Sequence, residues 1–212
     1  MDKLALFDVD YTLTRKETLM ELFKYSIKVK KSNIMYLPRA LFCGAMYGVK
    51  AYDEKQVKQC FLRFIKGFSK DQIEEIVEDF YKNRLSQILY SDGIEKLKEL
   101  KAQGYKVVLI SASPEFYLHK LYEIKEVDYI IGTRFKFEDN IFVGMMDGNN
   151  CKGEEKVVRL NEFIKENNLE VDYENSHMYS DSLSDLPLLK LVGNPHLINY
   201  KKKHEYKILN WK

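Results

Sequence analysis

The sequence predicts an α/β fold: a doubly wound, mostly parallel sheet with an inserted helical cap. Short apolar runs, which suit strands buried on both faces, alternate with amphipathic segments of helical spacing. A long helical section separates the first of these runs from all the others. Carboxylates and hydroxyls follow the ends of the runs, which is where open α/β sheets bind ligands. Together these features indicate an α/β core with a helical insertion after its first strand.

The first strand is expected over residues 4–7, where four apolar residues precede Asp8. The section from about residue 15 to residue 90 has helical spacing, most clearly over residues 73–81, where the intervening acids mark a solvated face. We therefore expect an α/β core made of residues 1–14 and 91–212, and a helical cap over residues 15–90.

After Gly93 the pattern changes to alternating helices and strands. Gly104 marks the end of the first expected helix of this part, because glycine commonly terminates helices. In chain order, we expect a helix over 94–103, strands over 107–110 and 129–131, a hairpin over 135–143, a helix over 157–164, a strand over 177–179 and a helix over 186–191.

Composition bounds the function. The chain has 212 residues, of which 45% are hydrophobic, so it can bury a core. Its formal net charge of +2 argues against a protein specialised for nucleic acid. Cys43, Cys60 and Cys151 are odd in number and far apart, so we expect neither a disulfide framework nor a zinc site. Reduced thiols and no visible signal peptide favour the cytoplasm.

The apolar stretch 34–49 invites a membrane interpretation. It is shorter than the roughly 18–20 apolar residues that a spanning helix needs, and it contains Pro38 and Arg39. We interpret it as helix and turn buried against neighbouring helices. A surface that contacts lipid or another apolar partner is the first alternative, and a true span is the second.

The segment from Asp8 to Thr12 has the pattern Asp-x-Asp-x-Thr at the end of the first expected strand. Residues two apart on a strand point the same way, so Asp8 and Asp10 could face one site. Two neighbouring carboxylates repel unless a cation neutralises them or one keeps its proton. A hard ion such as Mg²⁺ suits them, and the pair offers one group for attack and one for proton transfer. Alone, the pattern is a moderate signal that chance can also produce.

Three later segments strengthen this interpretation. Ser111 ends a buried run just before an expected helix at Pro114, and a helix N-terminus favours phosphate. Lys152 and Lys156 flank or open another expected helix, where an ammonium could reach bound phosphate. A third strand ends in Asp181 and Asp185. Each residue also has an ordinary structural explanation, as a cap or a surface charge, but their shared positions after strands favour one site.

With these four motifs in order, the chain resembles the haloacid dehalogenase-like superfamily, and in particular its phosphoserine phosphatase-like branch, whose helical cap follows the first motif. The resemblance implies a phosphatase with Asp8 as nucleophile and Asp10 as general acid and base. It implies that Mg²⁺ is held by Asp8, the backbone carbonyl of Asp10, and Asp181. The other implied roles are phosphate binding by Ser111 and a lysine, substrate contacts near Thr12, Glu17, Ala112 and Lys152, and orientation of neighbours by Asp185.

The resemblance leaves two matters open. Lys156 fits the spacing of one bacterial subset, whereas Lys152 fits the serine phosphatases proper, and we favour Lys156. Glu17 stands where serine phosphatases recognise the substrate amine, but Phe61 stands where they carry an arginine for the carboxylate, although Arg63 is close by. We therefore expect a small phosphomonoester substrate, with phosphoserine phosphatase and a catalytically silent phosphate-binding module as alternatives. The oligomeric state and the physiological substrate are not predicted.

Overall fold

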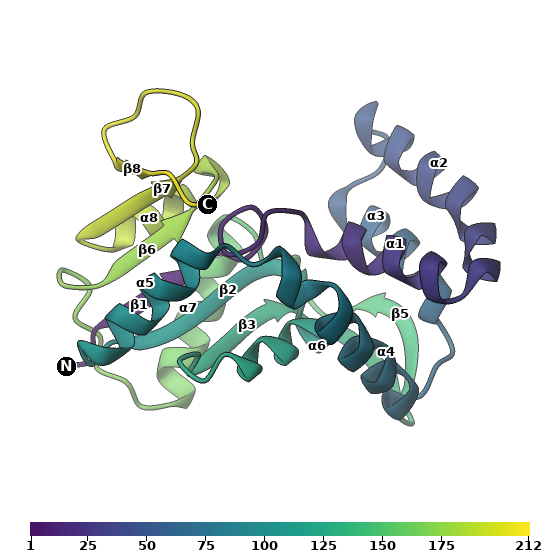
Figure 1. Cartoon of the computed structure of the whole chain (residues 1–212), viewed down its shortest axis with the longest axis horizontal. Helices are drawn as coiled ribbons and strands as arrows, with labels where there is room; N and C mark the ends of the chain where they lie inside the picture. The colour runs from purple at the N-terminus through teal and green to yellow at the C-terminus, as the bar shows by residue number, and fades with distance from the viewer. The chain divides into compact units, whose positions relative to one another are not determined.

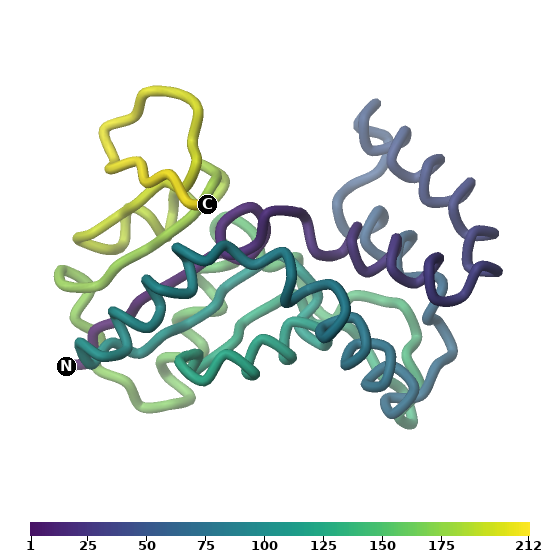
Figure 2. Tube along the Cα trace, viewed as in Figure 1, coloured from purple at the N-terminus to yellow at the C-terminus, as the bar shows by residue number.

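The computed structural model describes all residues, 1–212, and divides them into two compact units. Unit 1 comprises residues 1–17, 88–132 and 151–212, and unit 2 comprises residues 18–87 and 133–150. Figure 2 traces how the chain leaves unit 1 after its first strand and later returns to it. Each unit is described separately below.

Unit 1 is built on a six-stranded sheet (Figure 1). Its strand order is β3-β2-β1-β6-β7-β8, and the pairings of β1 with β2 and β6, of β6 with β7 and of β7 with β8 are all parallel. The strands are β1 (Leu4–Phe7), β2 (Lys106–Pro114), β3 (Tyr129–Thr133), β6 (His177–Ser180), β7 (Asn194–Ile198) and β8 (Lys207–Leu209). The chain moves outward from β1 to β3 and then to the other side of β1, so the strand order reverses between β1 and β6.

Helices pack against this sheet because alternate strand residues are apolar on both faces. On one face, Leu4 and Leu6 join a core with Leu160 and Leu188. On the other face, the ring of Phe7 stacks on Tyr179 at 4.5 Å. The helical elements of unit 1 are α5 (Ser91–Ala102), α6 (Glu115–Leu118), the 3₁₀ turn η4 (His119–Glu123), α7 (Glu154–Glu166), the 3₁₀ turn η5 (Leu183–Asp185) and α8 (Leu186–Leu191). The predicted doubly wound, mostly parallel α/β fold is confirmed.

Unit 2 combines helices with a two-stranded hairpin. Its elements are α1 (Thr18–Val29), η1 (Lys31–Tyr36), α2 (Leu37–Gly48), α3 (Glu54–Phe61), η2 (Leu62–Ile65), α4 (Lys70–Asn83), η3 (Leu85–Ile88), β4 (Phe135–Glu138) and β5 (Ile141–Met146). The hairpin joins the helices through backbone hydrogen bonds: the N–H of Gly67 donates to Phe142, and the N–H of Phe142 donates to Phe68. We had assigned residues 133–150 to the core, whereas the structure groups them with the helices.

The expectation of three reduced cysteines is wrong for two of them. Cys43 of α2 and Cys60 of α3 form a disulfide, while Cys151 is free and buried. The two partners are 17 residues apart in sequence, and the packing of α2 against α3 brings their Cα atoms to 6.6 Å. Sequence spacing alone could not show this, because the pairing depends on how two helices meet.

The interpretation of residues 34–49 as a buried segment is also wrong. Within α2 only Ala40 and Cys43 are buried. Ile34, Met35 and most of the other large apolar side chains of the stretch are exposed. None of the helices combines the length and the apolar character that crossing a membrane requires. The alternative of a surface that contacts lipid or another apolar partner stays a prediction.

Candidate active site

The predicted site residues of unit 1 come together at the carboxyl ends of β1, β2 and β6. Asp8 directly follows β1, Asp181 directly follows β6, and Ser111 lies near the end of β2. Because the strand order reverses between β1 and β6, this edge is a topological switch point, where open α/β sheets bind ligands. The backbone N–H of Asp8 donates to Tyr179 at 2.9 Å, which ties the end of β1 to β6.

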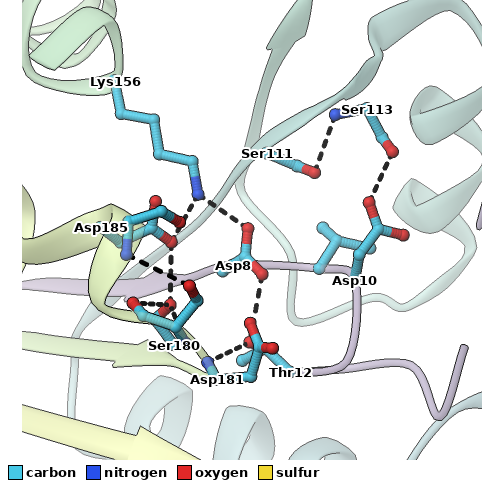
Figure 3. Close-up of polar contacts among 12 residues, drawn as sticks. Asp8, Asp10, Thr12, Ser111, Ser113, Lys156, Ser180, Asp181 and Asp185 are labelled. Atoms are coloured by element: carbon cyan, nitrogen blue, oxygen red, sulfur yellow. Dashed lines mark hydrogen bonds and ion pairs between the residues drawn. The ribbon is translucent and has the colours of Figure 1, made fainter. Parts of the chain in front are cut away.

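Lys156 lies at the centre of the site (Figure 3). Its side chain is only 1% exposed, and its Nζ is 2.7 Å from Asp8 Oδ1 and 2.7 Å from Asp185 Oδ2. It reaches this position from the first turn of α7. Lys152, which precedes that helix, is exposed. The structure therefore brings Lys156, rather than Lys152, to the carboxylates.

The second oxygen of Asp8 is held from the loop that follows it. The hydroxyl of Thr12 donates to Asp8 Oδ2 at 3.1 Å and accepts from the backbone N–H of Asp181 at 2.9 Å. The loop turns back on itself: Tyr11 has a φ of 59°, in the left-handed region, and the N–H groups of Leu13 and Thr14 both donate to the carbonyl of Val9. Both oxygens of Asp8 are thus fixed before any ligand binds.

Asp10 contacts β2 through a residue that the sequence analysis missed. The hydroxyl of Ser113 donates to Asp10 Oδ2 at 2.6 Å, and the backbone N–H of Ser113 donates to Ser111 Oγ at 3.1 Å (Figure 3). The signal was present, because Ser113 is two residues from Ser111 and such residues share a face of a strand. Ala112 lies between them and is half-buried.

The helix that we expect to begin at Pro114 begins one residue later and is very short. β2 continues through Pro114, and α6 covers only Glu115–Leu118. A helix of one turn has few aligned peptide dipoles, so the predicted phosphate-binding helix N-terminus is not supported there. The hydroxyls of Ser111 and Ser113 remain as polar groups at this strand end.

Asp185 is held behind Lys156 by a second missed residue. The hydroxyl of Ser180 donates to Asp185 Oδ2 at 2.9 Å and accepts from the N–H of Ser182 at 3.1 Å. The other oxygen of Asp185 is buried and has no hydrogen-bond partner. Because Asp185 contacts Lys156 and not Asp8, it positions the ammonium.

Burial and crowding perturb the charges of this site. Burial raises the pKa of Asp8 to about 7; Lys156 opposes this shift, while Asp185 and Asp10 add to it. Burial, and next the negative charge of Asp185, raises the pKa of Asp181 to about 6. Although burial alone would lower the pKa of Lys156, Asp8 and Asp185 raise it, so its ammonium stays charged. The site holds more negative charge than one ammonium balances.

The oxygen donors of this site suit a cation. No group of three or more His, Cys, Asp or Glu side chains is arranged to hold a metal ion. The set implied by the family resemblance contains only two carboxylates, Asp8 and Asp181, together with the backbone carbonyl of Asp10. These are hard oxygen donors at a site with raised carboxyl pKa values, which fits Mg²⁺.

Glu17 is half-buried and directly precedes α1. Its role, and those of Ala112 and Lys152 toward substrate, remain predictions.

The fold and the site define a doubly wound α/β protein in which acidic side chains meet at the switch point of a parallel sheet. A family model described as haloacid dehalogenase-like hydrolase matches residues 5–190, and the chain belongs to that family. This confirms the superfamily that the four motifs indicated.

Sequence relatives point to one branch of the family. Protein CicA of Caulobacter vibrioides is 28% identical over 191 residues, covering 89% of this chain and 82% of the relative. Histidinol-phosphatase of Neisseria meningitidis serogroup C is 26% identical and covers 94% and 91%. Phosphoserine phosphatase of Methanocaldococcus jannaschii is 25% identical and covers 90% and 82%.

Solved structures share the fold. A protein of unknown function from Bordetella pertussis has a TM-score of 0.88 at 21% identity, covering 99% of this chain and 98% of that one. A substrate-bound phosphoserine phosphatase has a TM-score of 0.64 at 20% identity, covering 95% and 88%. The predicted phosphoserine phosphatase-like branch is confirmed by these similarities.

Proposed function

We propose that the chain is a Mg²⁺-dependent phosphomonoester hydrolase that works through an aspartyl-phosphate intermediate on Asp8. The observation that carries the proposal is the fixed orientation of Asp8, whose two oxygens accept hydrogen bonds from Lys156 and Thr12. Family membership and phosphatase-named relatives support the reaction class.

In the first half-reaction, a carboxylate oxygen of Asp8 bonds to phosphorus while the bond from phosphorus to the ester oxygen breaks. Asp10 delivers its proton to the departing oxygen, which leaves as an alcohol. Ser113 holds the side chain of Asp10 by a 2.6 Å hydrogen bond, so the acid keeps one orientation. The phosphoryl group remains covalently bound to Asp8.

In the second half-reaction, water attacks phosphorus and gives its proton to Asp10. The bond between phosphorus and the Asp8 oxygen breaks, inorganic phosphate leaves, and Asp8 returns as a carboxylate. The same residue acts first as acid and then as base, as microscopic reversibility allows.

Lys156 contributes a preorganised positive charge. An ammonium has three N–H donors, and Asp8 and Asp185 accept two of them. The third is available to a phosphoryl oxygen, and Ser111 supplies a hydroxyl on the side of β2. Charged donors that are positioned before the reaction cost no reorganisation when negative charge develops in the transition state.

Asp8, Asp181 and the backbone carbonyl of Asp10 would hold Mg²⁺. When bound, Mg²⁺ neutralises the carboxylates and draws electron density from the phosphoryl oxygens. Asp185 and Ser180 do not bind the ion in this proposal. They orient Lys156 from behind.

Phosphoserine phosphatase is a second candidate for the specific activity, because one relative carries that name and Glu17 stands where the resemblance implies amine recognition. A catalytically silent phosphate-binding module is a candidate from another class. The retention of Asp8, Asp10 and Asp181 in one site argues for turnover.

The proposal is tested by phosphate release from p-nitrophenyl phosphate and a panel of phosphomonoesters. Activity should require Mg²⁺, disappear with EDTA and return when Mg²⁺ is added in excess. Asp8→Asn should abolish turnover, because an amide is a poor nucleophile. Asp139→Asn is the matched control: the same chemical change on an exposed hairpin residue at φ 47° should leave activity unchanged. Full turnover by folded Asp8→Asn, or activity indifferent to EDTA, contradicts the mechanism.

A further inference from the structure

The segment from residue 22 to residue 52 has an unusual charge composition. It contains six basic residues and no Asp or Glu, although the whole chain has nearly equal numbers of both kinds. The six are Lys24, Lys28, Lys30, Lys31, Arg39 and Lys50. All of them are exposed. A solvated helix face normally mixes both signs, so this surface is selectively complementary to negative charge.

The same segment exposes apolar side chains. Of the thirteen exposed large hydrophobic side chains in the protein, seven lie between residues 29 and 49. Leu41 is 65% exposed and Phe42 is 54% exposed, and the two are consecutive residues of α2. The others are Val29, Ile34, Met35, Tyr47 and Val49. Exposed apolar side chains that are concentrated in one segment, rather than scattered singly, indicate contact with a partner or a membrane.

A cationic cavity of about 490 Å³ adjoins this surface within unit 2. Arg39 and Phe42 belong both to the cavity wall and to the segment described above. Arg63 and Lys66 add two more cations, and no carboxylate lines the cavity. The combination of exposed apolar side chains with an acid-free cationic cavity matches the boundary of an anionic bilayer, where headgroup phosphates lie directly above acyl chains.

We propose that residues 22–52 form a docking surface for anionic membranes. Leu41, Phe42 and their apolar neighbours enter the boundary between headgroups and acyl chains, and the lysines and Arg39 contact lipid phosphates. α2 has only 12 residues, so the protein lies on the bilayer and does not span it. Binding here needs no catalysis, so its failure and the failure of the phosphatase proposal are distinguishable.

The test is cosedimentation of the purified full chain with vesicles of phosphatidylcholine alone or with about 30% phosphatidylglycerol. The protein should bind only the anionic vesicles, and more weakly at high salt, because salt screens the lysines. Lys28→Glu/Lys31→Glu should weaken binding by at least about 25-fold, since each lysine near an anionic surface contributes about fivefold and each glutamate adds repulsion. Leu41→Ser/Phe42→Ser should lose binding to the same vesicles.

Matched controls carry the same changes on exposed residues of unit 1. Lys125→Glu/Lys165→Glu and Tyr122→Ser/Val158→Ser should bind as the wild type does. Hydrolysis of p-nitrophenyl phosphate and thermal unfolding should be unchanged in both docking-surface variants. If Leu41→Ser/Phe42→Ser does not fold, the lysine pair decides, because its side chains are exposed and make no core contacts.

Four results overturn the proposal. They are absence of binding to anionic vesicles, equal binding to phosphatidylcholine, equal loss in the unit 1 controls, and a dimer in solution that Leu41→Ser/Phe42→Ser dissociates. The last result would show that a second copy of the chain covers the surface.

Discussion

Units 1 and 2 use their apolar residues differently. In unit 1 the strands β1 and β2 are almost wholly buried, and their side chains form a core shared with α7 and α8. In unit 2 helix α2 buries only Ala40 and Cys43 and exposes several large apolar side chains. Unit 1 therefore has the rigid, closely packed surroundings that a catalytic site needs. Unit 2 keeps apolar surface available to other molecules.

The charged residues differ in the same way. Unit 1 buries Asp8, Lys156 and Asp185 close together, and this perturbs the pKa values of Asp8 and Lys156. Unit 2 leaves its excess of lysine and arginine in solvent along residues 22–52. Buried and paired charges suit chemistry, whereas exposed cations suit recognition of anions. The difference suggests that reaction and recognition are divided between the units.

The largest loss of activity is expected when Lys156 is replaced, and the comparison with Lys152 tests the division between the units. Lys156→Ala removes the ammonium between Asp8 and Asp185 and should cost about 3–4 kcal/mol of transition-state stabilisation, as loss of other oxyanion contacts does. Lys152→Ala removes an exposed charge and should cost about 0–1 kcal/mol. The measurement is kcat/KM for the best phosphomonoester of the panel.

Circular dichroism and thermal unfolding are the controls for this pair, because Lys156→Ala leaves two buried carboxylates without their cation. The assignment of catalysis to the buried charges of unit 1 is wrong if Lys152→Ala loses activity and folded Lys156→Ala keeps it. In that case, the buried ion pair of unit 1 would be structural only.

Most of unit 1 could be predicted from the sequence, because its signals are local. The run 4–7 is continuously apolar and ends in Asp8, so both a buried strand and a polar strand end are visible. The expected strands over 107–110, 129–131 and 177–179 all lie within observed strands. The search for apolar runs misses β7 and β8. β7 begins with Asn194-Pro195-His196 and is strongly apolar only at its end, and β8 has only three residues.

The features that were missed depend on tertiary contacts. The elements that pack against α2 decide whether it is buried. Its own hydrophobicity is equally compatible with a buried helix and with an exposed apolar surface. The disulfide of Cys43 and Cys60 needs the approach of two helices. The partnership of Ser180 with Asp185 needs a turn whose geometry is not encoded in a period of 2 or 3.6 residues. Sequence patterns report periodic burial, and these three features are not periodic.

An intermediate effect is expected from pH, in a different range for each unit. In unit 1, burial and then the neighbouring His177 lower the pKa of His196 to about 4, from an ordinary value of 6.5. In unit 2, Glu21 has a lowered pKa: burial would raise it, but hydrogen bonds from Arg84 and Lys24 outweigh that effect. In both folded units the group named disfavours its protonated form, so His196 and Glu21 each contribute most to stability at neutral pH and lose that contribution in acid.

The pH range of the effect differs between the two units because the ordinary pKa values of histidine and glutamate differ. As pH falls below about 6.5, the unfolded chain protonates His196 while the folded chain resists, so the contribution of His196 to the stability of unit 1 should fall by about 2 kcal/mol by pH 5. The raised pKa values of Asp8 and Asp181 act in the opposite direction, and they do so equally in the wild type and in a His196 variant. Glu21 contributes nothing to this loss until pH falls below about 4.5. Urea unfolding followed by Trp211 fluorescence reports unit 1, because the only tryptophan packs near Phe7 and Tyr179.

His196→Phe is the informative variant, because it keeps a ring next to Tyr179, on which His196 stacks at 4.6 Å, and removes the titration. The unfolding free energy at pH 5, relative to that at pH 7.5, should be about 2 kcal/mol higher in that variant than in the wild type. His204→Phe is the matched control in unit 1, because the ring of His204 also packs against a tyrosine, Tyr206, at 4.7 Å, and its pH dependence should match that of the wild type. An unchanged pH dependence in His196→Phe would contradict the assigned role of His196.

The smallest expected effect concerns substrate choice. We expect L-phosphoserine to be a poorer substrate than the best phosphomonoester of a diverse panel. Phe61, which stands where serine phosphatases carry an arginine, packs edge-on against Phe23 at a centroid distance of 5.6 Å. A phenyl ring cannot pair with a carboxylate, and desolvating that carboxylate without a partner is unfavourable. The best substrate should carry an apolar or neutral group near its phosphate.

Arg63 provides the alternative, because it is exposed and lines the cationic cavity together with Arg39 and Lys66. The measurement is kcat/KM for L-phosphoserine beside the panel, in the wild type and in Arg63→Ala. If phosphoserine wins by tenfold or more, about 1.4 kcal/mol in transition-state binding, the expectation based on Phe61 is wrong. If Arg63→Ala then removes that preference and leaves neutral esters unaffected, Arg63 pairs with the carboxylate. If phosphoserine is a poor substrate for both the wild type and Arg63→Ala, the expectation holds that the enzyme prefers less polar phosphomonoesters.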